Sequence, residues 1–165
     1  MQPYEADARV PLIIAGPGLP HGVVVSQVSG LQDIAPTILA MTNEWGSQVS
    51  FSIDGMSLLP LANGGTSPRA QLLETAVTAP VREGNEFGAY GSRATITWKT
   101  RSIVTSQGWK LIRYLSTNEV ELYNLATDPF EKLNLGRDPH YDAIQAALAA
   151  RLTALKFCSG AGCRR

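Results

Sequence analysis

A short apolar run near the start of the chain places the strongest constraint on its fold. Residues Val10 to Ala15 read Val-Pro-Leu-Ile-Ile-Ala, and the breaker Gly16-Pro17-Gly18 ends the run. A continuous apolar run of this length is typical of a strand buried on both faces, as in a parallel sheet covered by helices. One such strand cannot form a parallel sheet alone, so we expect its neighbours to come from sequence outside this chain.

The residues that follow predict a strand-like run, a helix and a long loop. Val23 to Val28 is a second β-prone run. Asp33 to Met41 predicts a helix, with Asp33 as its N-terminal cap. Thr42 to Pro80 is rich in Gly, Pro, Asn and Ser, which predicts a surface loop with a short amphipathic piece from Met56 to Leu61.

The second half of the chain predicts a small antiparallel sheet and a terminal helix. Turn residues separate four short β-rich runs, at Ala94–Trp98, Arg101–Thr105, Gly108–Tyr114 and Glu119–Tyr123. Asp138 is a possible cap for the helix that follows. In that helix, apolar residues recur at spacings of three and four: Tyr141, Ile144, Leu148, Leu152 and Leu155. We therefore divide the chain into residues 1–80, with strand, helix and loop, and residues 81–165, with sheet and helix.

Charge and hydropathy exclude some classes of function. The 14 basic and 14 acidic side chains give a formal net charge of zero, which offers no electrostatic footprint for nucleic acid or an anionic membrane. No apolar run approaches the roughly 18 to 20 residues that a membrane span needs. The first ten residues lack the basic start and apolar middle of a signal peptide. The chain is therefore either cytosolic or a piece whose targeting segment lies elsewhere.

The two cysteines, Cys158 and Cys163, both lie at the end of the chain. The four residues between them include two glycines, which lets the loop close into a small disulfide ring. A zinc site would need two further Cys or His ligands nearby, and the sequence has none there. Two free thiols remain the alternative. A structural disulfide would imply an oxidising compartment.

The ionisable residues do not predict a catalytic or metal site. His21 and His140 lie far apart in sequence and have no carboxylate or second histidine at metal-ligand spacing, so we expect both on the surface. Glu119 and Glu121 share a strand face that we expect to be solvated. Asp54-Gly55 is first of all a turn dipeptide.

The aromatic residues of the predicted sheet allow two interpretations. Trp98, Trp109, Tyr114 and Tyr123 favour core and cross-strand packing over a carbohydrate platform. Two arginines, Arg101 and Arg93, lie beside them in sequence. Either guanidinium could hold a sulfate or a uronate by a bidentate contact, so both are weak candidates for substrate binding.

Five short motifs follow one another along almost the whole chain. They are Tyr4-Glu5-x-Asp7-x-Arg9-Val-Pro-Leu-Ile-Ile-x-Gly16-Pro-Gly18, Asp33-Ile-x-Pro36-Thr-Ile-Leu39, Asp54-Gly-Met-Ser-Leu-Leu-Pro60, Trp109-Lys-Leu-Ile-Arg-Tyr114 and Glu121-Leu-Tyr-Asn-Leu-x-x-Asp128-Pro129. In this order they resemble the C-terminal part of the sulfatase family. The ending Cys158-Ser-Gly-x-x-Cys163-Arg164 resembles the glucosamine-6-sulfatase and arylsulfatase branch.

The resemblance implies an alkaline-phosphatase-like α/β sandwich with a smaller C-terminal subdomain. That subdomain has a four-stranded antiparallel sheet and a terminal helix in this family. Val10–Ala15 would then be a late strand of the large sheet, which makes the chain a fragment. An exposed edge at this run would give a sticky, poorly soluble chain.

The resemblance also implies hydrolysis of sulfate esters, on aryl or glycan substrates. The family's nucleophile is a formylglycine made from the Cys of a Cys-x-Pro-x-Arg motif, and a calcium ion held by Asp and Asn side chains polarises the sulfate. This sequence has no Cys-x-Pro-x-Arg motif, and the family's metal ligands and active-site histidines match no position in it.

We therefore expect no catalytic and no metal-binding residue in this chain. The resemblance places them upstream of Met1, in the missing N-terminal catalytic part of the same protein, so the isolated chain should be inactive. It implies that the parent is secreted or lysosomal. A stand-alone module that binds glycans or a protein, or a fragment of a related phosphodiesterase or phosphatase, remain the alternatives.

Overall fold

The computed structural model describes residues 2–16, 18–42, 52–79 and 95–164 of the chain. The helices are α1 Glu5–Ala8, α2 Ile34–Met41, α3 Leu59–Ala62 and α4 Asp142–Lys156. Three 3₁₀ turns accompany them: η1 Leu31–Asp33, η2 Pro139–Tyr141 and η3 Gly160–Arg164. The strands are β1 Ala70–Ala79, β2 Thr95–Thr105, β3 Trp109–Tyr114 and β4 Val120–Asn124.

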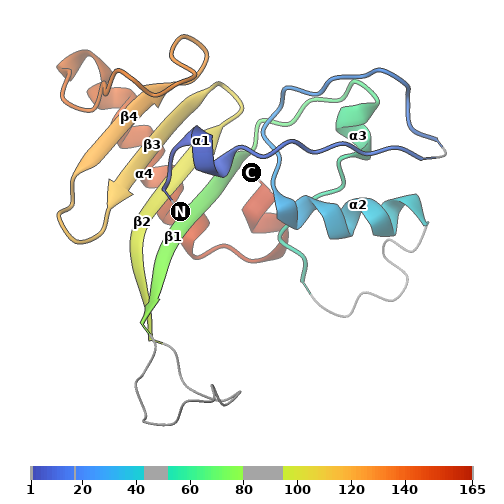
Figure 1. Cartoon of the computed structure of the whole chain (residues 1–165), viewed down its shortest axis with the longest axis horizontal. Coiled ribbons are helices and arrows are strands. Elements are labelled where there is room, and N and C mark those ends of the chain that lie inside the picture. Colours follow the sequence, from blue (N-terminus) through green and yellow to red (C-terminus); the bar gives the residue numbers. More distant parts are fainter. Residues whose placement is uncertain (1, 17, 43–51, 80–94, 165) are drawn as a thin grey trace.

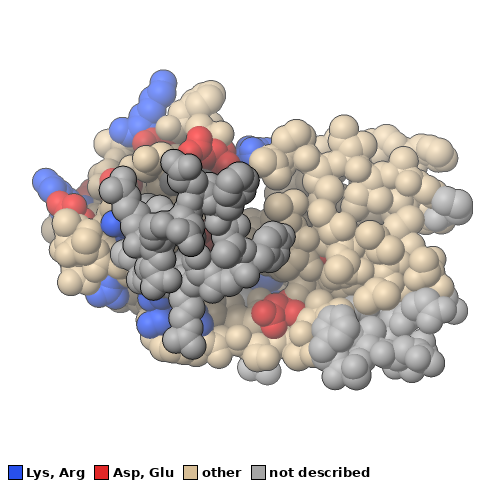
Figure 2. Space-filling model, turned by 60° about the horizontal axis from the view of Figure 1, so that its bottom comes forward, with Lys and Arg blue, Asp and Glu red and all other residues tan. Residues whose placement is uncertain are grey.

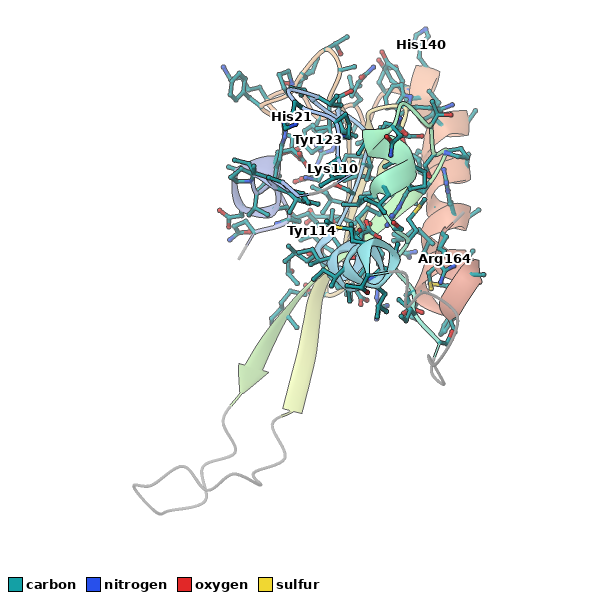
Figure 3. All side chains as sticks on the ribbon, turned by 90° about the vertical axis from the view of Figure 1, so that its right-hand side faces the viewer. His21, Lys110, Tyr114, Tyr123, His140 and Arg164 are labelled. Atoms are coloured by element: carbon teal, nitrogen blue, oxygen red, sulfur yellow. A yellow bond between two sulfur atoms is a disulfide. The ribbon has the colours of Figure 1, made fainter. Side chains whose placement is uncertain are left out.

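The four strands form one antiparallel sheet in the order β1-β2-β3-β4 (Figure 1). Helix α4 covers one face of this sheet, and α1 lies against the other face (Figures 1 and 3). Helices α2 and α3 lie together beside the sheet. The predicted four-stranded antiparallel sheet and terminal helix are therefore confirmed.

One row of apolar side chains crosses the whole sheet beneath α4. Leu72 pairs with Ile103, Ile103 with Leu111, and Leu111 with Leu122. Because side chains opposite one another in a sheet point to the same face, this row forms a continuous surface. The helix packs onto it the three buried leucines of the predicted periodic pattern, Leu148, Leu152 and Leu155. Asp138 accepts a hydrogen bond from the His140 backbone N–H at 3.0 Å, so it caps η2, which leads into α4.

The sheet differs from its prediction in two strands. The runs Ala94–Trp98 and Arg101–Thr105 belong to a single strand, β2, and Ala94 itself lies outside the described residues. Strand β1 lies in the stretch Thr42–Pro80 that was predicted to be loop. Its sequence carries three alanines and no strict alternation, so intrinsic preference does not mark it as a strand. Pairing with β2 along its whole length makes it one.

Neither Val10–Ala15 nor the β-prone run Val23–Val28 forms a strand within this chain, and pairing of Val10–Ala15 with strands outside the chain stays a prediction. Neither segment has regular secondary structure, and Ile13 and Val24 are 90% and 92% exposed. A strand needs a hydrogen-bonded neighbour, and the described residues provide none for these segments. We call their exposed side chains the N-terminal apolar surface: Val10, Leu12, Ile13, Ile14, Val23, Val24 and Val25.

Charge is distributed unevenly over the molecule. On the face drawn in Figure 2, the described acidic and basic side chains gather over the sheet, and the side with α2 and α3 is mostly neutral. Within the described ranges, no helix is both long and apolar enough to cross a bilayer. The charged groups that could organise a site therefore lie mainly on and beside the sheet.

Candidate functional site

The residues singled out as binding candidates do not form a common site. Arg101 donates from Nε to Glu74 on β1 at 2.5 Å, and both side chains are about three-quarters buried or more, at 18% and 25% exposed. Arg101 as a substrate-binding residue stays a prediction, and Arg93 lies outside the described residues. His21 and His140 are both exposed, as predicted. The side chain of Trp98 also lies outside the described part of the structure.

The face of the sheet opposite α4 carries a cluster of three tyrosines around one carboxylate, which we call the Glu121 cluster. The Tyr4 hydroxyl donates to Glu121 at 3.0 Å, and it lies 2.9 Å from the Tyr114 hydroxyl. Tyr123 also donates to Glu121, at 3.1 Å, and Tyr114, whose hydroxyl lies 3.3 Å from the carboxylate, is the donor left for the bond to Tyr4. The prediction that Glu121 faces solvent is therefore wrong, because the alternation of β4 turns it toward the face that the N-terminal residues cover.

The Glu121 cluster keeps its tyrosines protonated. The pKa of Tyr4 is raised well above its ordinary value of 10.0, first by the hydrogen bond with Tyr114 and then by burial and the Glu121 carboxylate. Burial is the main cause for Tyr114 and Tyr123, whose pKa values are also raised. An ionised carboxylate can only accept hydrogen bonds, so it favours neutral hydroxyls that donate to it.

A buried lysine lies on the same face, next to this cluster (Figure 3). The Lys110 ammonium is fully buried and ion-pairs with Glu5 at 2.9 Å and Glu131 at 2.8 Å. The Glu131 side chain is only 3% exposed, and its second oxygen accepts the Glu5 backbone N–H at 2.5 Å. We call these three residues the Lys110 centre. The two ion pairs share one ammonium between two carboxylates and attach α1 to the sheet.

A second buried ion pair joins the α2 region to the sheet. Asp33, predicted to be a helix cap, makes no such hydrogen bond to α2, so that prediction is wrong. Its carboxylate instead accepts from Arg69 at 2.8 Å, from the Gly30 N–H at 2.8 Å and from the Met56 N–H at 2.9 Å. Asp33 and Arg69 are 0% and 1% exposed. A buried carboxylate needs such partners, and these join three segments distant in sequence.

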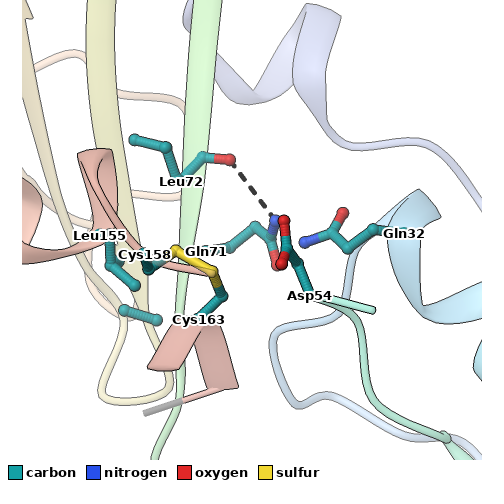
Figure 4. A pocket seen from close by; sticks show the side chains of 8 residues that line it. Gln32, Asp54, Gln71, Leu72, Leu155, Cys158 and Cys163 are labelled. Carbon is teal, nitrogen blue, oxygen red and sulfur yellow. Dashed lines mark hydrogen bonds between the residues drawn. A yellow bond between two sulfur atoms is a disulfide. The ribbon is translucent and has the colours of Figure 1, made fainter. Parts of the chain in front are cut away.

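A small cavity of about 220 Å³ lies where the α2 region, β1 and the end of α4 meet (Figure 4). The polar side chains at its edge are Gln32, Asp54 and Gln71, and its apolar wall is formed by Ala70, Leu72, Leu155 and the Cys158–Cys163 disulfide. The predicted disulfide is therefore confirmed. Asp54, predicted as a turn residue, accepts the Gly160 N–H at 2.6 Å.

Sequence reasoning did not identify the residues of the Glu121 cluster, the Lys110 centre or the Asp33–Arg69 pair as interacting groups, although four of the motifs contain several of them. Tyr4 and Glu5 come from the first motif, Asp33 from the second, and Lys110 and Glu121 from the last two. A lysine two residues from Ile112 on an otherwise apolar strand face was the signal that could have found Lys110. The sequence offers no comparable signal for Arg69.

Comparison with known structures supports the fold. The phosphonate monoester hydrolase of Silicibacter pomeroyi matches 84% of this chain with a TM-score of 0.60 and 23% identity, and the match covers 27% of that chain. The sheet, α4 and this likeness assign the chain to the alkaline-phosphatase-like class of α/β folds.

Comparison with protein families is more specific. The family described as N-sulphoglucosamine sulphohydrolase, C-terminal, matches residues 2–157, so the chain belongs to this sulfatase C-terminal family. The choline-sulfatase of Rhizobium meliloti is 31% identical over 153 residues, which are 89% of this chain and 25% of the relative. The arylsulfatase of Chlamydomonas reinhardtii is 32% identical over 178 residues, with 97% and 27% covered. The chain thus spans about a quarter of the length of these relatives.

Proposed function

We propose that this chain forms the C-terminal part of a sulfatase that hydrolyses sulfate esters. The observation that carries the proposal is the family match over residues 2–157, in a chain that spans only a quarter of its sulfatase relatives. The relatives' names point to choline sulfate and aryl sulfates as substrate classes. In the proposed assembly, the partner of this chain is the catalytic part of the same protein.

The residues of this chain do not fit a formylglycine or a calcium site. Both cysteines are joined in the disulfide, and neither stands in a Cys-x-Pro-x-Arg motif. Among the described residues, no group of three His, Cys, Asp or Glu side chains could hold a metal ion. We therefore infer that the catalytic part provides both groups and that the isolated chain is inactive.

The N-terminal apolar surface supports this division of roles. Seven apolar side chains between residues 10 and 25 are exposed, and exposed apolar surface of this kind marks a surface that another part of a protein covers. In the proposed assembly, Val10–Ile14 adds to the edge of a sheet in the catalytic part. The disulfide supports an oxidising compartment for the whole protein, as expected of a secreted or lysosomal sulfatase.

A chimera tests the proposal. The matching C-terminal quarter of the Rhizobium meliloti choline-sulfatase is replaced by this chain, and sulfate release is measured from choline sulfate and an aryl sulfate. We expect activity from the chimera and none from the isolated 165-residue chain. Turnover by the isolated chain would contradict the assignment of catalysis to the missing part.

A matched variant tests the proposed contact. Ile13→Asp should leave the unfolding of the isolated chain unchanged, because the side chain is exposed there. In the chimera the same change would bury a charge and should abolish activity or soluble expression. An Ile13→Asp chimera as active as its parent would show that this surface does not contact the catalytic part.

A further inference from the structure

The last residues of the chain form a closed loop that we call the C-terminal clasp, residues 158–164. It begins where α4 ends, and the disulfide joins Cys158 to Cys163 across a sequence separation of five. Closing so short a loop restricts the unfolded chain much less than closing a long one. We therefore expect this disulfide to act mainly in the native structure, by holding the segment that the clasp contacts.

The clasp contacts a segment more than a hundred positions earlier. The Gly160 N–H donates to Asp54 at 2.6 Å, and Arg164 Nη2 donates to the Ile53 carbonyl at 2.6 Å. Gly160 has a φ of +57°, and a Cβ at this position would lie 2.2 Å from the Ser52 hydroxyl oxygen. The backbone of the clasp therefore fits directly against residues 52–54.

The other end of this segment is held by the buried Asp33–Arg69 ion pair, which contains no disulfide. The Met56 N–H donates to the Asp33 carboxylate at 2.9 Å. Gly55 lies so close to the backbone of Gln32 that a Cβ there would be 2.0 Å from the Gln32 carbonyl oxygen. Residues 52–56 are thus anchored twice, and only the anchor on the clasp depends on a bond that a thiol can break.

The same segment and the same disulfide form walls of the cavity. Asp54 lies on one side of it, and both cysteines and Leu155 lie on the other (Figure 4). Both cysteines are half-buried and line a cavity that opens to solvent, so a small thiol can reach them.

We propose that the Cys158–Cys163 disulfide is a thiol-controlled clasp that sets the position of residues 52–54 and the width of this cavity. A dithiol reductant attacks one sulfur as a thiolate, forming a mixed disulfide and breaking the Cys158–Cys163 bond. The sulfur that leaves takes up a proton. The second thiol of the reductant then closes the reductant's own disulfide, releasing the other cysteine as a thiol. Two electrons and two protons reach the protein, the clasp opens, and Gly160 separates from Asp54.

Hydrogen–deuterium exchange of the whole 165-residue chain tests the proposal, with and without dithiothreitol. In the reduced protein we expect the Gly160 amide, which loses its hydrogen bond to the Asp54 carboxylate, to exchange about tenfold faster or more. The amides of Ile103, Leu111 and Leu122 serve as internal controls and should not change. Alkylation and mass spectrometry confirm that both thiols are free.

Two variants separate the clasp from a general stabilising role. Asp54→Ala removes the acceptor and keeps the disulfide, so its Gly160 amide should already exchange faster and should no longer respond to dithiothreitol. The double change Cys158→Ser and Cys163→Ser should reproduce the reduced state without reductant. Unchanged exchange of the Gly160 amide in fully reduced protein would overturn the proposal. So would faster exchange throughout the sheet, because the disulfide would then hold the whole fold.

Discussion

Two regions of the molecule place the same kind of residue in opposite environments. In the sheet layer, residues 70–157, Ile103 is completely buried between the strands and α4. In the N-terminal segment, residues 10–28, Ile13 is 90% exposed. Both lie in runs with strong β character, but within the described part of the chain Ile103 has neighbouring strands and Ile13 has none. Burial in this molecule is thus decided by the presence of a partner strand more than by the residue itself.

The two regions also use charge differently. The sheet layer contributes Lys110 and Glu131 to the Lys110 centre, in which a fully buried ammonium meets two carboxylates. The N-terminal segment from Val10 to Ile14 carries no charged side chain at all. The Lys110 centre includes Glu5, which lies just before that segment, so it is the joint between the sheet layer and the segment with the exposed apolar side chains.

The largest expected effect is at that joint. Lys110→Met should lower the free energy of unfolding by about 3–5 kcal/mol, because it leaves buried carboxylates without their cation. Residues 2–9 should separate from the sheet, which trypsin cleavage after Arg9 would report. Urea unfolding measures the stability.

Lys132→Met is the matched control, because Lys132 is exposed and stacks on Phe130. It should change stability by less than about 0.5 kcal/mol. Equal effects of the two changes would show that the buried centre does not hold the joint.

The next prediction compares the stability cost of the same change, isoleucine to alanine, in the two regions. Ile103→Ala should cost about 2–5 kcal/mol, since it opens a cavity in the core. Ile13→Ala should stay within about 0.5 kcal/mol in the isolated chain, because its side chain is exposed. Urea midpoints of the two variants give the difference. A large loss for Ile13→Ala would mean that the N-terminal segment is packed within this chain after all.

The smallest expected effect is a loss of folding stability at alkaline pH, which comes from the tyrosines of the Glu121 cluster. The tyrosine pKa values are raised in the folded chain, so their contribution is complete below the ordinary value of 10.0. It is lost as the pH rises from there toward the folded pKa values, because the unfolded chain ionises first. Urea unfolding from about pH 8 to pH 11 should show falling stability. Glu121→Gln should weaken this slope, and an unchanged slope would contradict the role of the carboxylate.

The sequence predicts the sheet layer well where pattern and partner agree. Strand β4 carries local alternation, turn residues flank β3, and α4 carries its three buried leucines at helical spacing. The sequence pattern misleads in opposite ways at strand β1 and at the run Val10–Ala15. The first is a strand without a pattern, because β2 pairs with it, and the second is a pattern without a strand, because no described residue pairs with it.

The site could be predicted as a set of motifs but not as a set of contacts. Glu5 and Lys110 are 105 positions apart, and Asp33 and Arg69 are 36 apart. Local periodicity carries no information about pairs at such distances. The motifs that carried the resemblance to sulfatases nevertheless include most of these residues, so those motifs mark the contacts that join the sheet to the rest of the chain.

The order β1-β2-β3-β4 has a consequence for how the chain folds. Strands β2 to β4 are joined by the short turns 106–108 and 115–119, whereas the contact of Tyr4 with Glu121 spans 117 positions. Closing a short loop costs less conformational entropy than closing a long one, and chains rich in local contacts fold quickly. We therefore expect the hairpins to form first, so that the sheet is already in place when the N-terminal residues reach it.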